Sequence, residues 1–153
     1  MSFHIVLFEP QIPQNTGNIG RLCVNSGSTL HIVGMPAFDI SEKAVRRAGL
    51  DYWKDLSLVL HKTWEDFWQY SSNIGRTFVI SKFGKKKYSD CKFLDNDFFV
   101  FGKETTGLPQ NIRNQFDEDD ILYIPMQEGS RSINLSNSVA IVLYEGIRQT
   151  SLL

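Results

Sequence analysis

Short apolar runs alternate along this chain with longer segments in which apolar residues recur every three or four positions. The apolar runs predict buried strands at residues 4–8, 29–33, 77–81, 98–101 and 121–124. The periodic segments predict helices at residues 15–26, 41–48, 64–70, 109–115 and 135–149. The run 56–60 fits either element. The alternation predicts an α/β fold, with a mostly parallel sheet and helices on both of its faces.

Single residues mark several of these boundaries. Gly27 is placed to end the first helix in the left-handed conformation that glycine tolerates. Asn15 or Thr16 is expected to cap the beginning of that helix, and Thr63 with Asp66 resembles a capping box for a later one. Neither an internal repeat nor a linker-like stretch interrupts the pattern, so all 153 residues are expected to form one domain.

The composition is that of an ordinary globular protein, with 42% hydrophobic residues, 22% charged residues and a net charge of -1. This charge argues against a generally basic nucleic-acid-binding surface and leaves room for a local one. Two cysteines, Cys23 and Cys91, occur without an N-terminal signal pattern, which favours the reducing cytoplasm. No apolar run approaches the roughly 18 residues of a membrane span, so no membrane association is expected.

Three polar loops follow predicted strands, at residues 9–21, 101–109 and 124–137. The carboxyl ends of parallel strands meet at one edge of a sheet, and the amides that open a following helix are unpaired donors. A ligand that is anionic or forms hydrogen bonds is therefore expected where the three loops converge.

Each loop also has a purely structural interpretation. The first would be a capped helix with a solvated Arg21, and the second a tight turn with Gly107 in the left-handed conformation. The third would be a helix N-terminus capped by Ser132 or Asn134. In the functional interpretation, Glu104 of the second loop accepts hydrogen bonds from hydroxyls or amines of a ligand.

Several common sites are excluded by the sequence. A Walker A loop does not fit, because Asp97 and Glu104 occupy positions that require glycine and serine or threonine. Neither G-x-G-x-x-G nor G-x-S-x-G occurs. His4, His31 and His61 lie far apart in the sequence and the two cysteines are isolated, so no metal site is predicted. Each histidine is expected at a strand end or on the surface.

Taken together, the three loops resemble the ordered motifs of the SPOUT-class RNA ribose 2′-O-methyltransferases. The resemblance is carried by Asn15 and Arg21, then Phe101-Gly102-x-Glu104-Thr105-x-Gly107-Leu108-Pro109, then Ile124-Pro125-Met126 with Ser130-Arg131-Ser132-x-Asn134-Leu135-Ser136-Asn137. Two further segments are similar to the enzymes of this class that methylate the wobble nucleotide, position 34, of tRNA: Glu9-Pro10-x-Ile12-Pro13-x-Asn15-Thr16-Gly17-Asn18 and Arg46-Arg47-Ala48-Gly49-Leu50-Asp51-Tyr52.

This resemblance spans nearly the whole chain and implies a C-terminal deep trefoil knot and an obligate homodimer that acts on tRNA. Knots are rare exceptions to the usual rules of chain topology, so periodicity could not have revealed one. The implied methyl donor is S-adenosylmethionine, which leaves as S-adenosylhomocysteine, and no metal is implied. The residues that match the cofactor pocket of the family are Ile80, Gly102, Glu104, Leu108, Ile124, Ser132, Ile133 and Leu135.

The catalytic motifs of the family are matched by Arg21, Asn15, Ser132 and Asn134. A guanidinium group stays protonated, so Arg21 is expected to hold a phosphate or stabilise a developing alkoxide rather than to act as the base. In the family, the arginine of one subunit is thought to complete the site of the other. The motifs leave open which side chain takes the proton of the ribose hydroxyl.

Basic residues supply the candidate contacts to RNA phosphates. One group surrounds Lys43 on a predicted short helix, and a second lies at residues 82–87, opposite the acidic run 117–120. Either group could be a solvated face. The side chains expected to contact RNA are Arg21, Arg46, Arg47, Arg131 and Tyr144.

Two positions depart from the family pattern. Thr106 stands where relatives often carry arginine, and Gly20 occupies a position that is often bulkier. The loss of a cation beside Glu104 is expected to weaken contacts to RNA or to the cofactor.

Two other functions stay open beside wobble methylation. The first is 2′-O-methylation of another position in tRNA or ribosomal RNA, against which the lack of an added RNA-binding domain argues. The second is RNA binding without catalysis by a knotted protein. Retention of all four motif residues, Arg21, Glu104, Ser132 and Asn134, argues against it.

Overall fold

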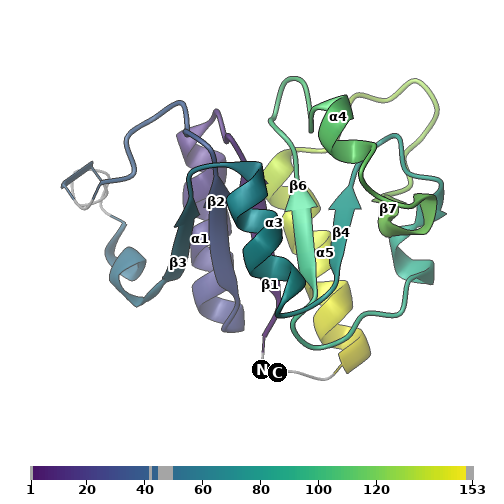
Figure 1. The fold of residues 1–153 in the computed structure, drawn as a ribbon. Coiled ribbons are helices and arrows are strands. Elements are labelled where there is room, and N and C mark those ends of the chain that lie inside the picture. The colour runs from purple at the N-terminus through teal and green to yellow at the C-terminus, as the bar shows by residue number, and fades with distance from the viewer. Residues whose placement is uncertain (1, 42, 45–49, 151–153) are drawn as a thin grey trace.

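A seven-stranded parallel sheet forms the centre of the molecule in a computed structural model that describes residues 2–41, 43–44 and 50–150 (Figure 1). The strand order across the described sheet is β3-β2-β1-β6-β4-β7-β5. The strands are β1 (His4–Phe8), β2 (Thr29–Val33), β3 (Ser57–His61), β4 (Thr77–Ile80), β5 (Lys86–Lys87), β6 (Phe98–Phe101) and β7 (Ile121–Tyr123). The predicted α/β architecture is thus confirmed.

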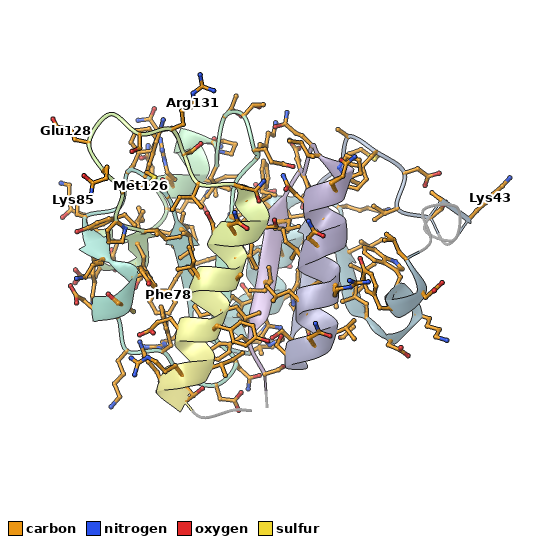
Figure 2. The ribbon with its side chains drawn as sticks, turned by 180° about the vertical axis from the view of Figure 1, so that it is seen from behind. Lys43, Phe78, Lys85, Met126, Glu128 and Arg131 are labelled. Carbon is orange, nitrogen blue, oxygen red and sulfur yellow. The ribbon has the colours of Figure 1, made fainter. Side chains whose placement is uncertain are left out.

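Helices cover both faces of this sheet. On one face α1 (Pro13–Ser26) and α5 (Leu135–Thr150) lie side by side (Figure 2). On the other face lie α3 (Trp64–Ser72) and the short α4 (Gln110–Arg113), as Figure 1 shows. Among the described residues, none of the helices has the length and apolar character needed to cross a membrane.

Two hydrophobic clusters pack between the sheet and its helices, because successive strand residues point to opposite faces. Ile5 and Leu7 of β1 belong to the cluster under α1 and α5, whereas Val6 and Phe8 belong to the cluster under α3 and α4. Burial on both faces explains why the central strands read as continuous apolar runs rather than as alternating ones.

The boundaries of the elements differ from the predictions in a few places. The run 56–60 is strand β3, shifted by one residue. Helix α1 begins at Pro13, and its N-cap residue Ile12 makes no side-chain capping bond. The prediction that Asn15 or Thr16 caps this helix is therefore wrong. Proline suits the first turn of a helix, so Pro13 rather than Asn15 marks the beginning of α1.

The caps predicted at Thr63 and Gly27 are confirmed. The Thr63 hydroxyl accepts the Asp66 amide at 3.1 Å, which caps α3 as predicted. The Ala44 amide donates to the Ser41 hydroxyl at 3.3 Å, at the beginning of the helix predicted for residues 41–48. The remainder of that helix lies outside the described residues. Gly27 ends α1 in the left-handed conformation, with φ of 69°.

The three histidines form a buried ladder across β1, β2 and β3, which the sequence did not reveal. The Nδ1 atom of His4 lies 2.9 Å from Nε2 of His31, and Nδ1 of His31 lies 3.0 Å from Nε2 of His61. His31 is fully buried in mid-strand, so the expectation of a strand-end or surface position is wrong for this residue. The parallel register of three neighbouring strands brings together side chains that are distant in sequence.

Candidate active site

A cavity of about 380 Å³ opens at the carboxyl ends of β4, β6 and β7. It is bounded by the loops that follow β6 and β7 and by the beginnings of α1 and α5. All eight residues predicted to contact the cofactor line it: Ile80, Gly102, Glu104, Leu108, Ile124, Ser132, Ile133 and Leu135. The convergence of the polar loops at one edge of the sheet is confirmed.

The loop after β6 is a tight turn that forms one wall of the cavity. The backbone groups of Lys103 and Gly107 exchange two hydrogen bonds, of 2.9 and 3.2 Å, and Gly107 has a φ of 71°. A side chain at Gly102 would place its Cβ atom 2.1 Å from the amide nitrogen of Leu108. Glycine is thus required at Gly102 for the turn to fold back onto the end of its own strand.

Glu104 fastens the first loop to the second. One carboxylate oxygen accepts the Gln11 amide at 2.9 Å, and the other accepts the Ile12 amide at 2.7 Å and the Asn15 side-chain amide at 3.3 Å. Hydrogen bonds to a carboxylate are stronger than those between neutral groups. Glu104 therefore borders the cavity while its carboxylate is engaged by protein groups rather than presented to a ligand.

Asn15 and Asn134 join the third loop to the same network. The Asn134 side-chain amide donates to Oδ1 of Asn15 at 3.0 Å. The oxygen of Asn134 meanwhile accepts the Ser136 and Asn137 amides, at 2.9 and 3.3 Å, and so caps α5. Of the two predicted caps, Ser132 and Asn134, it is Asn134 that caps α5. The chain Glu104–Asn15–Asn134 thus connects all three loops.

Arg21 lies apart from the other three predicted catalytic residues. Asn15, Ser132 and Asn134 line the first cavity, whereas Arg21 lines a second cavity of about 560 Å³ beside α1. Its guanidinium carbon is 5.1 Å from the centre of the Tyr52 ring. The Tyr52 hydroxyl donates to the Gly17 carbonyl, and burial raises the pKa of this hydroxyl. Within one chain, the four predicted catalytic residues are therefore divided between two cavities.

The predicted RNA contacts are spread over the surface. Arg131 extends from the loop before α5 (Figure 2), and Tyr144 is 42% exposed on that helix. Neither lines the first or the second cavity. Arg46 and Arg47 lie outside the described residues, and the nearby Lys43 projects from the edge of the molecule (Figure 2).

The predicted basic group at residues 82–87 reaches the first cavity through Lys82, and the sequence did not reveal its neighbours Phe83 and Arg113 there. Phe83 is 60% exposed, with the Lys82 ammonium 5.3 Å and the Arg113 guanidinium carbon 4.2 Å from its ring centre. Arg113 and Thr106 line the same cavity, so this cavity has a cation although Thr106 stands where relatives often carry arginine. An exposed aromatic residue between basic ones was the available signal.

Known proteins are similar to this chain in sequence and in fold. The tRNA (cytidine(34)-2′-O)-methyltransferase of Methylovorus glucosotrophus is 44% identical over 147 residues, covering 96% of this chain and 95% of that protein. A structure solved in work on 2′-OH methylation of C/U34 on tRNA is 36% identical with a TM-score of 0.88, covering 97% and 95% of the two chains.

A more distant structure shares the fold alone. The SpoU methyltransferase AviRb of Streptomyces viridochromogenes, solved with AdoMet, is 23% identical with a TM-score of 0.81 and covers 97% of this chain and 60% of its own. The profile of the SpoU rRNA methylase family matches residues 2–144, and the chain belongs to this family.

Proposed function

We propose that this protein transfers a methyl group from S-adenosylmethionine to the ribose 2′-hydroxyl of the wobble nucleotide, position 34, of tRNA. The observation that carries the proposal is the Glu104–Asn15–Asn134 network, which holds all three loops around one cavity. The 44% identity to a tRNA (cytidine(34)-2′-O)-methyltransferase over nearly the full length of both chains supports the choice of target.

The first cavity suits a nucleoside-like cofactor. Its apolar walls include Ile80, Leu108 and Ile124, and Thr105, Ser132 and Asn134 add polar side chains. Such a combination of aliphatic surface and a few fixed polar groups is typical of small-molecule sites. When bound, S-adenosylmethionine supplies an activated methyl group, so the chain need not supply a leaving group.

The main contribution of the protein to catalysis is therefore positioning. An in-line attack requires the ribose oxygen and the methyl carbon at near-attack distance, which an ordered site provides. Among the described lining residues of both cavities there is no histidine. The carboxylate of Glu104 is held by three donors, so its role is to fix the loops rather than to take a proton.

The active form is proposed to be a homodimer with a knotted C-terminal half. The division of Asn15 and Arg21 between two cavities supports a site completed by Arg21 of the partner subunit. Exposed apolar side chains on α5 and the adjoining loops, which a second copy would cover, are Ile12, Met126 and Tyr144. The proposed place of action is the cytoplasm, where tRNA substrates are found.

Cofactor binding provides the first test. Calorimetry should detect S-adenosylmethionine binding to the wild type and none to Ile133→Arg, whose side chain would fill the first cavity. The same two proteins should then be compared for transfer of labelled methyl groups to bulk tRNA and, separately, to ribosomal RNA. Cofactor binding without any transfer would point to RNA binding without catalysis, and transfer to ribosomal RNA alone would replace the proposed substrate.

A further inference from the structure

The second cavity has walls of mixed chemistry. It lies between the first two turns of α1 and the segment that leads to Trp53. Aromatic side chains of Phe38, Tyr52 and Trp53 form part of its lining, together with the cation of Arg21. Rings and a guanidinium group in one cavity provide stacking surfaces for planar groups.

Thr16 lines the same cavity and has an unexplained polar group. The residue is 1% exposed, and its hydroxyl has no hydrogen-bond partner among the described residues. Most buried hydroxyls in folded proteins are paired, because an unpaired one loses its bonds to water without replacement. A valine would fill this position without the cost of burying an unpaired hydroxyl. A ligand that forms a hydrogen bond with this hydroxyl would explain why threonine occurs here.

The part of the cavity wall formed by Tyr52 and Trp53 is held close to α1 by contacts with Gly17 and Gly20. A Cβ atom at Gly20 would lie 2.9 Å from the Trp53 ring, so glycine is what admits the indole. The Tyr52 hydroxyl donates to the Gly17 carbonyl, which fixes the second ring against the helix. The unusual Gly20 thus has a structural role in shaping this cavity.

We propose that the second cavity binds a base of the RNA substrate, with the Thr16 hydroxyl as a hydrogen-bond partner of that base. A base fits better than a phosphate, because the three aromatic rings of the lining offer flat surfaces on which a base can stack. Amino groups of bases also pair well with oxygen acceptors. Arg21 would lie over the bound base, beside the ribose that reacts.

This inference rests on the proposed function, in that the ligand is the RNA being methylated. It adds a recognition element that differs from the cofactor cavity and that joins residues of the first motif loop to the aromatic side chains of Phe38, Tyr52 and Trp53. Stacking on aromatic side chains and hydrogen bonds to base edges are the usual means of recognising unpaired RNA, such as an anticodon loop.

The matched variants Thr16→Val and Thr16→Ser test the proposal. Valine keeps the shape and removes the unpaired hydroxyl, so the melting temperature of the free protein should rise by about 2–4 °C. The dissociation constant for a synthetic anticodon stem-loop, measured by fluorescence anisotropy, should increase about three- to tenfold. Thr16→Ser should bind the stem-loop like the wild type, and both variants should bind S-adenosylmethionine normally.

The proposal would be overturned if Thr16→Val bound the stem-loop as tightly as the wild type. A fall in its melting temperature would also overturn the proposal, because the hydroxyl would then have a partner within the protein. These readouts do not require turnover. A wild-type protein that binds the stem-loop and transfers no methyl group would contradict the proposed function and leave the test of the base site intact.

Discussion

Acidification should destabilise the protein through the histidine ladder. His31 is fully buried and is hydrogen-bonded through both ring nitrogens to His4 and His61. Burial, together with the like charges that His4 and His61 would carry, lowers the pKa of His31 to about 3. Burial also lowers the pKa of His4 and of His61. Protonation therefore favours the unfolded chain.

The size of the effect follows from the pKa of His31. In the unfolded chain its pKa is about 6.5, so below that pH the unfolded state binds one more proton than the folded state. The contribution of neutral His31 to the free energy of unfolding is complete above about pH 6.5 and is lost progressively as the pH falls towards 3. Each pH unit within this window costs about 1.4 kcal/mol, which gives a loss of about 2 kcal/mol between pH 7 and pH 5.

Urea denaturation of the wild type and of His31→Gln at pH 7 and pH 5 measures this loss. Glutamine can form hydrogen bonds and does not titrate. The variant is expected to be less stable at pH 7, because its fit between His4 and His61 is poorer. Its loss on acidification should nevertheless be about 2 kcal/mol smaller than that of the wild type, since titrating groups that lie away from residue 31 contribute equally in both proteins. Equal losses in the two proteins would refute the reasoning.

Three further predictions concern the network and the divided site. Glu104→Gln leaves at least one of the three donors to this carboxylate unpaired. We therefore expect the free energy of unfolding to fall by about 1.5–3 kcal/mol and methyl transfer to fall at least tenfold. Unchanged denaturation curves would contradict the hydrogen bonds assigned to Glu104. Asn134→Asp keeps the cap of α5 and loses the donor to Asn15, whereas Asn134→Ala loses both. In thermal denaturation, the alanine variant should be about 1 kcal/mol less stable than the aspartate variant. Both variants should lose methyl transfer. Full activity of Asn134→Asp would show that the contact to Asn15 is dispensable. Arg21→Ala and Ile133→Arg should each be inactive, yet co-expression in equal amounts should restore about one quarter of wild-type transfer, since half of the dimers would be mixed and each would hold one intact site. No recovery in separately tagged, co-purified dimers would place Arg21 in its own subunit's site.

The architecture was accessible from the sequence because the central strands carry unbroken apolar runs, which only burial on both faces permits. The convergence of the polar loops was accessible for a different reason. Gly102 and Ile124 follow strands directly, and the carboxyl ends of parallel strands share one edge of the sheet. The eight predicted cofactor contacts came instead from the resemblance to the family.

Contacts between distant segments were not accessible from the sequence. Glu104 looked like a ligand for hydroxyls or amines, but its carboxylate is engaged by the Gln11 and Ile12 amides, more than ninety residues away in the chain. The position of a partner across the fold cannot be read from local spacing. The ladder of His4, His31 and His61 depends in the same way on the register of three strands.

The most direct test of the proposed function is to map the methylated nucleotide. Labelled methyl groups from S-adenosylmethionine would be transferred by the purified protein to tRNA from cells that lack its gene, and nuclease digestion would locate the label. We predict label on the ribose 2′-oxygen of nucleotide 34, and none with Arg21→Ala. Label at another nucleotide, or on a base, would contradict the assignment.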